Sequence, residues 1–148
     1  PWIVLLRGGP NVQPRIPQYY FPTRDGNIVR QLRGKKIKSV PALMDDFGAA
    51  FQFFYEFGEN WHALGRMPFL LDEWLVAQRY VAWIDHAEQV LTEETDAAQL
   101  RWLMLTLGEA GDWWSKPVVG NGRFDRPAGT FVSVLRLPEN CIDSFIAD

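Results

Sequence analysis

Apolar residues in this chain follow two alternating patterns. Four short runs of apolar, β-prone residues lie at 2–6, 28–32, 80–84 and 130–135, and each run predicts a strand. The run at 80–84 is continuously apolar, which is typical of a central strand covered on both faces. Between the last three runs, apolar residues recur at helical spacing. This alternation predicts an α/β protein with a mainly parallel sheet and right-handed crossovers.

Three helices are expected from this spacing and from the capping residues that precede it. The first helix follows Ser39, and a short second helix follows Asn60. The third and longest helix follows Thr95 or Asp96 and ends between residues 111 and 114. The expected buried face of the first helix consists of Val40, Leu43, Met44, Phe47, Phe51 and Phe54. The expected buried stripe of the longest helix consists of Leu100, Leu103, Met104, Leu107 and Ala110.

The order of these elements predicts one domain over residues 28–148, built on a small, mainly parallel three-stranded sheet with helices packed on it. Residues 1–27 are interpreted as an N-terminal extension packed on that domain, which could add an edge strand. Three prolines interrupt the aromatic residues between 11 and 23, so an irregular segment is expected there. Residues 115–129 are rich in Gly, Pro and charge, and they predict a long loop that is an insertion or a working surface.

Composition narrows the class of function. The 148 residues carry a net charge of -3, which offers no basic footprint for direct binding of nucleic acid. No apolar run approaches the roughly 20 residues of a membrane helix, so no membrane association is expected. The lone Cys141 cannot form an internal disulfide and the first residues lack a basic signal start, which favours the cytoplasm. Seven Trp and ten Phe are many for this length, and such an excess of large aromatic residues is typical of a partner surface.

The sequence does not contain the residue spacings that are typical of catalytic or metal-binding sites. The two histidines, His62 and His86, do not stand at the spacing of a metal-binding pair, so no metal and no other cofactor is expected. No nucleophile signature surrounds Cys141, and the Gly-rich stretches lack the residues of a phosphate-binding loop. An enzyme using His62 and Glu59 would need a cleft, which a short exposed helix seldom supplies. The protein is therefore not expected to be an enzyme.

Residues 57–64 read Phe-Gly-Glu-Asn-Trp-His-Ala-Leu, and this stretch resembles the motif that opens the second helix of the barstar family. In that family the motif is Tyr/Phe-Gly-Glu-Asn-Trp/Leu-Asp-Ala-Leu. The strands and helices around it agree in order and spacing with the family, and the likeness covers about residues 28–136. Proteins with this fold inhibit a ribonuclease by laying the motif loop and second helix over its active site, where acidic side chains replace substrate phosphates.

The resemblance implies an immunity protein that binds and neutralises a bacterial toxin in a 1:1 complex. The expected toxin is a ribonuclease domain of a contact-dependent or polymorphic toxin system. By the same resemblance, the partner-binding residues lie on the motif loop, on the second helix and at the end of the long helix. They are Glu56, Phe57, Gly58, Asn60, Trp61, His62, Arg66, Glu109 and Trp113.

Three of these residues depart from the charges of the family. His62 replaces the Asp of the motif, Arg66 stands where the family carries a further Asp, and Trp113 replaces an acid. Glu59 and Glu109 match acidic positions of the family. Pro68-Phe69 reads as a small insertion after the motif helix. A partner surface of mixed charge is expected from this pattern, in place of a purely basic cleft.

Structural roles compete with contact roles at several positions. Gly58 and Asn60 are expected first to shape a turn and a helix cap, and Trp61 could belong to the core or to the contact surface. His62 could lie on a solvated polar face, and the pair Trp113-Trp114 could extend a binding patch or cover the sheet edge. A non-catalytic regulatory module that binds an endogenous protein is the alternative function.

Overall fold

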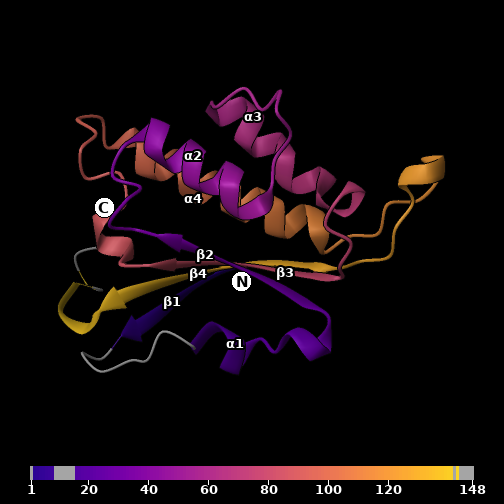
Figure 1. The fold of residues 1–148 in the computed structure, drawn as a ribbon, viewed down its shortest axis with the longest axis horizontal. Helices are drawn as coiled ribbons and strands as arrows, with labels where there is room; N and C mark the ends of the chain where they lie inside the picture. The colour runs from indigo at the N-terminus through magenta and orange to yellow at the C-terminus, as the bar shows by residue number, and fades with distance from the viewer. Residues whose placement is uncertain (1, 9–15, 142, 144–148) are drawn as a thin grey trace.

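A computed structural model of the chain describes residues 2–8, 16–141 and 143. Its centre is a four-stranded sheet in the order β1-β4-β3-β2, in which every neighbouring pair is parallel. The strands are β1 (Ile3–Gly8), β2 (Asn27–Arg33), β3 (Arg79–Asp85) and β4 (Thr130–Pro138). The predicted α/β class is confirmed, and the N-terminal extension does add an edge strand, paired with β4 (Figure 1).

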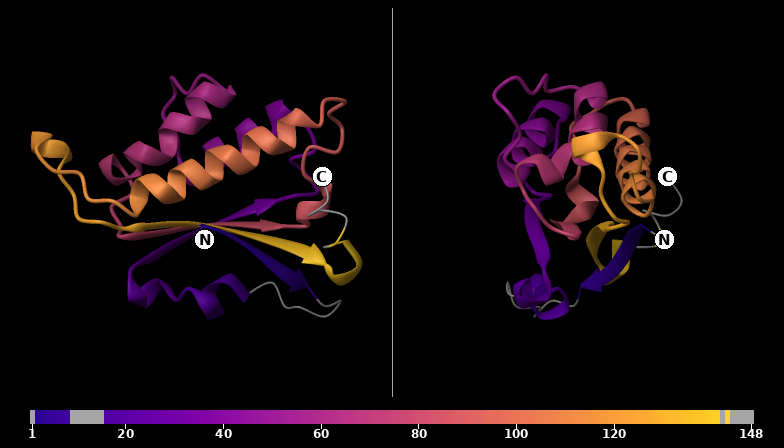
Figure 2. Two further views of the ribbon diagram at one scale, coloured as in Figure 1. Left: turned by 180° about the vertical axis from the view of Figure 1, so that it is seen from behind. Right: turned by 90° about the vertical axis from the view of Figure 1, so that its right-hand side faces the viewer.

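Helices cover both faces of this sheet. On one face lie α2 (Val40–Phe51), α3 (Trp61–Arg66) and α4 (Ala98–Trp114), and on the other lies α1 (Ile16–Tyr20) (Figure 2). Short 3₁₀ segments complete the chain: η1 (Thr23–Asp25), η2 (Met67–Glu73), η3 (Ala87–Gln89), η4 (Gly122–Phe124) and η5 (Glu139–Cys141). Among the described residues, none of the helices has the length and apolar character needed to cross a membrane.

The direction of the crossovers explains why α1 lies on the opposite face of the sheet from α2, α3 and α4. The connections from β2 to β3 and from β3 to β4 each step one strand in the same direction, with their helices on one face. The connection from β1 to β2 steps across the whole sheet in the opposite direction. Because parallel crossovers are right-handed, reversing the direction moves the connection to the opposite face. The segment containing α1 therefore covers the side that α2, α3 and α4 leave open.

The irregular segment predicted between residues 11 and 23 is partly wrong. Residues 16–20 form α1 and η1 begins at residue 23, whereas residues 11–15 lie outside the described part of the chain. Pro17 is the second residue of α1, where the backbone N–H that proline lacks would have no helical partner. The Tyr20 ring stacks on Trp83 of β3 at a centroid distance of 6.4 Å, so the segment is held to the sheet by an aromatic contact.

The core lies mainly between the sheet and the three helices on its larger side. Tyr80, Ala82 and Ile84 of β3 belong to this core, whereas Val81 and Trp83 belong to a smaller cluster on the α1 side. The prediction of a central strand covered on both faces is therefore confirmed for β3. Other residues of the main core are Leu32, Leu43, Met44, Phe47, Phe51, Leu64, Leu71, Leu103, Leu107, Phe131 and Leu135.

Two predictions about buried helix faces need correction. Phe54 is 42% exposed, because α2 ends at Phe51 and Gln52 takes a left-handed conformation with φ 56°. The ring of Phe54 packs on Trp74 outside the helix, with centroids 4.4 Å apart. In α4, Leu100 and Met104 are only half-buried, whereas the other members of the predicted stripe are buried.

Helix starts are capped in two different ways. Ala97 occupies the N-cap position of α4 without a side-chain bond, and Asp96, one residue earlier, accepts a hydrogen bond from the backbone N–H of Ala98 at 2.9 Å. Ser39 occupies the N-cap position of α2 but its side chain makes no capping bond. Instead, Glu94 Oε1 accepts a bond from the backbone N–H of Val40 at 2.6 Å, which ties α2 to the loop before α4.

Candidate partner-binding site

The motif loop and the first turn of α3 are held by a local network. Asn60 Oδ1 accepts a hydrogen bond from the backbone N–H of Ala63 at 2.9 Å, and Asn60 Nδ2 donates to the Gly58 carbonyl oxygen at 2.8 Å. Between Gly58 and Asn60, Glu59 takes a left-handed backbone conformation with φ 48°, which is unfavourable for residues other than glycine. The predicted capping role of Asn60 is confirmed, and the loop before α3 is fixed in one shape.

Two aromatic residues of the motif attach this loop and helix to the domain. Trp61 is half-buried against the main core, and its Nε1 donates to Gln99 Oε1 at the start of α4, at 2.7 Å. Phe57 is also half-buried and meets Phe53 edge to face, with centroids 5.0 Å apart. Both side chains therefore have a structural role, while Glu56 in the same loop is exposed.

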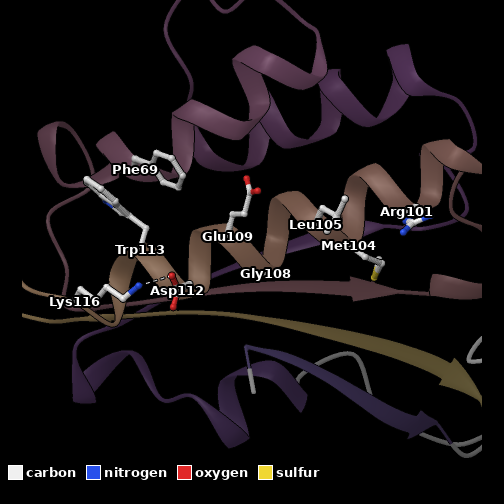
Figure 3. A pocket seen from close by; sticks show the side chains of 9 residues that line it. All are labelled: Phe69, Arg101, Met104, Leu105, Gly108, Glu109, Asp112, Trp113 and Lys116. Carbon is white, nitrogen blue, oxygen red and sulfur yellow. Dashed lines mark hydrogen bonds and ion pairs between the residues drawn. The ribbon is translucent and has the colours of Figure 1, made fainter.

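Three neighbouring hollows share Phe69, which follows the motif helix in the chain. The first, of about 520 Å³, lies between α3 and α4 and is lined by Trp61, His62, Gly65, Arg66, Phe69, Trp102, Leu105, Thr106 and Glu109. The second, of about 620 Å³, extends along the length of α4 (Figure 3). It is lined by Phe69, Arg101, Met104, Leu105, Gly108, Glu109, Asp112, Trp113 and Lys116. The third, of about 310 Å³, is lined by Arg66, Phe69, Leu70, Asp72, Glu73, Trp113, Val118, Asn121, Phe124 and Arg126.

Phe69 lines all three hollows, so we refer to their joined lining as the Phe69 surface. The Phe69 side chain comes from η2 and faces Trp113 on α4 in Figure 3, with the two rings stacked at a centroid distance of 5.0 Å. Leu105 and Glu109 are shared by the first two hollows. The surface therefore runs without interruption from α3 across α4 to the loop that follows α4.

Some of the predicted contact residues lie on this surface and others do not. His62, Arg66, Glu109 and Trp113 line it, as does the half-buried Trp61. The remaining predicted residues, Glu56, Phe57, Gly58 and Asn60, line none of the three hollows. The predicted set is thus divided between the surface itself and the loop that positions α3.

Three apolar residues on the surface escaped the sequence interpretation. Trp102 is 52% exposed and Leu105 is 49% exposed, and both lie on the outer side of α4. With Glu109 and Trp113 they follow a helical spacing of three and four residues, which was a detectable signal of a second stripe on this helix. Phe69 falls in the segment interpreted as an insertion, and its sequence context gives no sign of its central position.

Charges of both signs surround the apolar part of the Phe69 surface. Asp112 and Lys116 form an ion pair at 2.6 Å across one turn of α4. In contrast, the side chains of Arg66, Arg101 and Glu109 make no hydrogen bond or ion pair with any described residue. Such unpaired charges around exposed aromatic residues are available to a partner of opposite charge pattern.

The loop at residues 115–129 forms an ordered arm beside the third hollow. Val118 and Arg126 pair as an antiparallel bridge, and the Asp125 carboxylate accepts bonds from the backbone N–H groups of Gly120 and Asn121. The Arg126 guanidinium donates to the Trp113 carbonyl oxygen at 3.1 Å, and burial lowers its pKa. The arm is therefore fixed to the end of α4, and in Figure 1 it projects beyond the sheet.

The two tryptophans of the pair Trp113-Trp114 differ in burial and in contacts. Trp114 is 2% exposed, packs against Tyr80 and donates from Nε1 to the Pro68 carbonyl oxygen at 2.7 Å. Trp113 is 41% exposed and lies on the Phe69 surface. Trp114 thus belongs to the core, and only Trp113 is placed to contact another molecule.

Residues that could hold a metal do not gather at this site. Within the described ranges, no three His, Cys, Asp or Glu side chains are grouped so that they could hold a metal ion. The chemistry that the site offers is apolar contact, hydrogen bonding and ion pairing. That set of interactions suits recognition of another macromolecule.

Comparison with models of known protein families identifies the family of this chain. A family model described as Barstar (barnase inhibitor) matches residues 27–126, which is more than half of the chain. The matched segment contains β2, α2, α3, β3 and α4, and it ends in the arm at Arg126. No curated protein matches the sequence.

Proposed function

The chain belongs to the barstar family, and we propose that it is an immunity protein that binds and neutralises a ribonuclease toxin domain. The family itself is named for an inhibitor of the ribonuclease barnase. In this proposal the chain performs no catalysis. It binds the toxin in a 1:1 complex in the cytoplasm of the cell that makes both proteins or receives the toxin from a neighbour. The observation that carries the proposal is the family match together with the Phe69 surface beside the family's motif helix.

The Phe69 surface has the composition of a protein interface. Exposed Trp102, Leu105 and Trp113 line the hollows with the half-buried Phe69, as do Arg66 and Glu109, whose side chains pair with no other described residue. Aromatic residues and arginine are enriched in binding hot spots, and a charged rim around an apolar centre is the usual anatomy of an interface.

The charges of α3 change which toxin the chain would fit. His62 and Arg66 stand where the family carries acids, whereas Glu109 keeps an acidic position. We therefore expect the toxin surface to present carboxylates toward α3 and a basic group toward Glu109 of α4. Complementary charges of this kind would steer the encounter with the toxin.

Co-expression tests this function. The chain, carrying an affinity tag, is expressed with the product of the adjacent gene, and capture and growth are measured. The Phe69→Ala/Arg66→Glu double variant removes the central ring and reverses one charge of the surface. Its matched control is Val76→Ala/Arg24→Glu, because Val76 is 85% exposed, the Arg24 side chain is 86% exposed, and neither lines the three hollows.

We expect wild type and control to capture the toxin and restore growth, and the double variant to do neither. Rescue by the double variant at the wild-type level would keep the immunity role and move the interface elsewhere. If wild type captures an endogenous protein without ribonuclease activity and gives no rescue, the regulatory alternative is favoured. Light scattering of the purified complex gives the stoichiometry, for which we expect one copy of each chain.

A further inference from the structure

Two glycines on the Phe69 surface have no explanation in the packing of this chain. Gly108 lies in the interior of α4 and Gly65 lies in the last turn of α3, and glycine in a helix is less stable than alanine. Neither residue has the positive φ that would require glycine. A Cβ atom built on either residue would meet no other atom within 4 Å. An alanine therefore fits both positions without moving anything in the protein itself.

In contrast, the packing of the chain does require glycine at a third helix position, Gly111. Gly111 lies one turn after Gly108 on α4, and a Cβ atom there would lie 2.2 Å from Cβ of Trp2. Gly111 is buried and lets Trp2, next to the start of β1, approach α4 closely. The contrast between the two glycines of one helix means that Gly108 is open to space that is empty in the free protein.

Each of the two open glycines faces a different hollow of the Phe69 surface. Gly65 lines the hollow between α3 and α4, and Gly108 lines the hollow that extends along α4. Side chains at these positions would stand up into the hollows and make them shallower. Leu105 and Phe69 line both hollows and provide apolar surface shared by the two sites.

We propose that Gly65 and Gly108 keep two receptor sites open for apolar side chains of the protein partner, at a cost in helix stability. The proposal rests on the proposed function, because the occupant is the toxin that the inhibitor binds. The two helices then contain glycine in place of a better helix former because the binding site requires it. Such a loss of folding stability is expected at a functional site.

Charged side chains around the two hollows indicate which partner side chains would enter them. Arg66 lines the first hollow, Arg101 lines the second, and Glu109 lies between them on both. None of the three is paired with a described residue. A complementary partner presents aliphatic or aromatic side chains flanked by carboxylates toward Arg66 and Arg101 and by one basic group toward Glu109. This pattern is the chemistry by which the partner's contact segment is recognised.

Stability and affinity are measured on the same variants to test the proposal. Gly65→Ala, Gly108→Ala and the larger Gly108→Leu are compared with Gly111→Ala by urea denaturation. Their affinity for the catalytically inactivated product of the adjacent gene is measured by calorimetry. We expect both alanines at the open positions to raise the denaturation midpoint and to weaken binding about tenfold each, with a larger loss for leucine. Gly111→Ala should lower the midpoint and leave the affinity of the folded protein unchanged.

Three other outcomes overturn the proposal, and they differ in what they leave standing. A lower midpoint for Gly65→Ala and Gly108→Ala would make these glycines structural. A raised midpoint with unchanged affinity in all three filling variants would remove the receptor sites and leave the immunity function intact. Absence of binding by the wild type would reject the immunity function and the receptor sites together.

Discussion

The Phe69 ring stacks on the Trp113 indole, with centroids 5.0 Å apart and planes 30° apart. Phe69 comes from the 3₁₀ segment after the motif helix, and Trp113 comes from the last turn of α4. The contact fixes two rings side by side on the surface proposed to bind the toxin. Rigid aromatic side chains lose little conformational entropy on binding, so the pair is well suited to anchor a partner.

Replacing the central ring should weaken binding far more than it weakens folding. For Phe69→Ala we expect a loss of about 2 kcal/mol or more in binding free energy, because the residue lines all three hollows. Calorimetric titration with the inactivated toxin measures it, and Val76→Ala serves as the control for loss of an exposed apolar residue. Equal affinities for Phe69→Ala and wild type would place the centre of the interface elsewhere.

The helix cap at Asn60 should contribute to folding stability. Asn60→Ala removes the acceptor for the backbone N–H of Ala63, and we expect the free energy of unfolding to fall by about 1 kcal/mol. Asn60→Asp keeps an acceptor at this position and should lose less, although it gives up the bond to the Gly58 carbonyl oxygen. Urea denaturation measures both variants. An Asn60→Ala midpoint equal to that of wild type would show that the cap is dispensable.

The contact between Gly111 and Trp2 gives a test of the N-terminal extension. Gly111→Ala should destabilise the fold by about 1–3 kcal/mol, because the added methyl would overlap Trp2 Cβ, which is fixed to the backbone. Trp2→Ala retains that Cβ atom and should not relieve the overlap, whereas Trp2→Gly should. A double-mutant cycle with Trp2→Gly measures the coupling. Purely additive effects would contradict the close packing of Trp2 on α4.

The hydroxyl of Tyr80 should make folding stability depend on pH in the alkaline range. Burial raises the pKa of this hydroxyl to about 12 from the ordinary value of 10.0, and the hydroxyl donates to the Leu75 carbonyl oxygen. The unfolded chain loses this proton near pH 10, whereas the folded chain retains it until near pH 12. Stability from this residue is therefore complete below pH 10 and falls by an amount on the order of 2 kcal/mol as pH rises to 12.

The variant Tyr80→Phe isolates this contribution from other groups that titrate at high pH. It should be less stable at neutral pH, because the Leu75 carbonyl oxygen loses its donor, and it should lose less stability between pH 10 and 12. The comparison uses urea denaturation of both proteins at several pH values. Parallel curves for the two proteins would mean that Tyr80 does not contribute to the alkaline loss of stability.

Features with local causes could be predicted from the sequence. The Asn60 cap and the hydrogen bond from Ala98 to Asp96 join groups within three residues of each other, so their sequence position was sufficient. The apolar run of β3 also gave its central position, because a strand covered on both faces cannot alternate in polarity. The family motif then placed α3 in a recognisable context.

Features with distant causes could not be predicted in this way. Val40 receives its cap from Glu94, on a segment far along the chain, and the Ser39 side chain beside it makes no capping bond. Phe69 becomes the centre of the candidate site only because η2 folds against the last turn of α4. The sequence likewise gave no reason to separate the open Gly108 from the closely packed Gly111, since the difference depends on Trp2.

Inhibition of RNA cleavage tests the central claim most directly. The purified chain is titrated into the ribonuclease encoded by the adjacent gene, and cleavage of a labelled RNA is followed. We expect activity to fall in proportion to added inhibitor and to reach zero at one equivalent, while Phe69→Ala/Arg66→Glu requires a large excess. Undiminished cleavage at a tenfold excess of the folded wild-type chain would contradict the proposal that it neutralises this toxin.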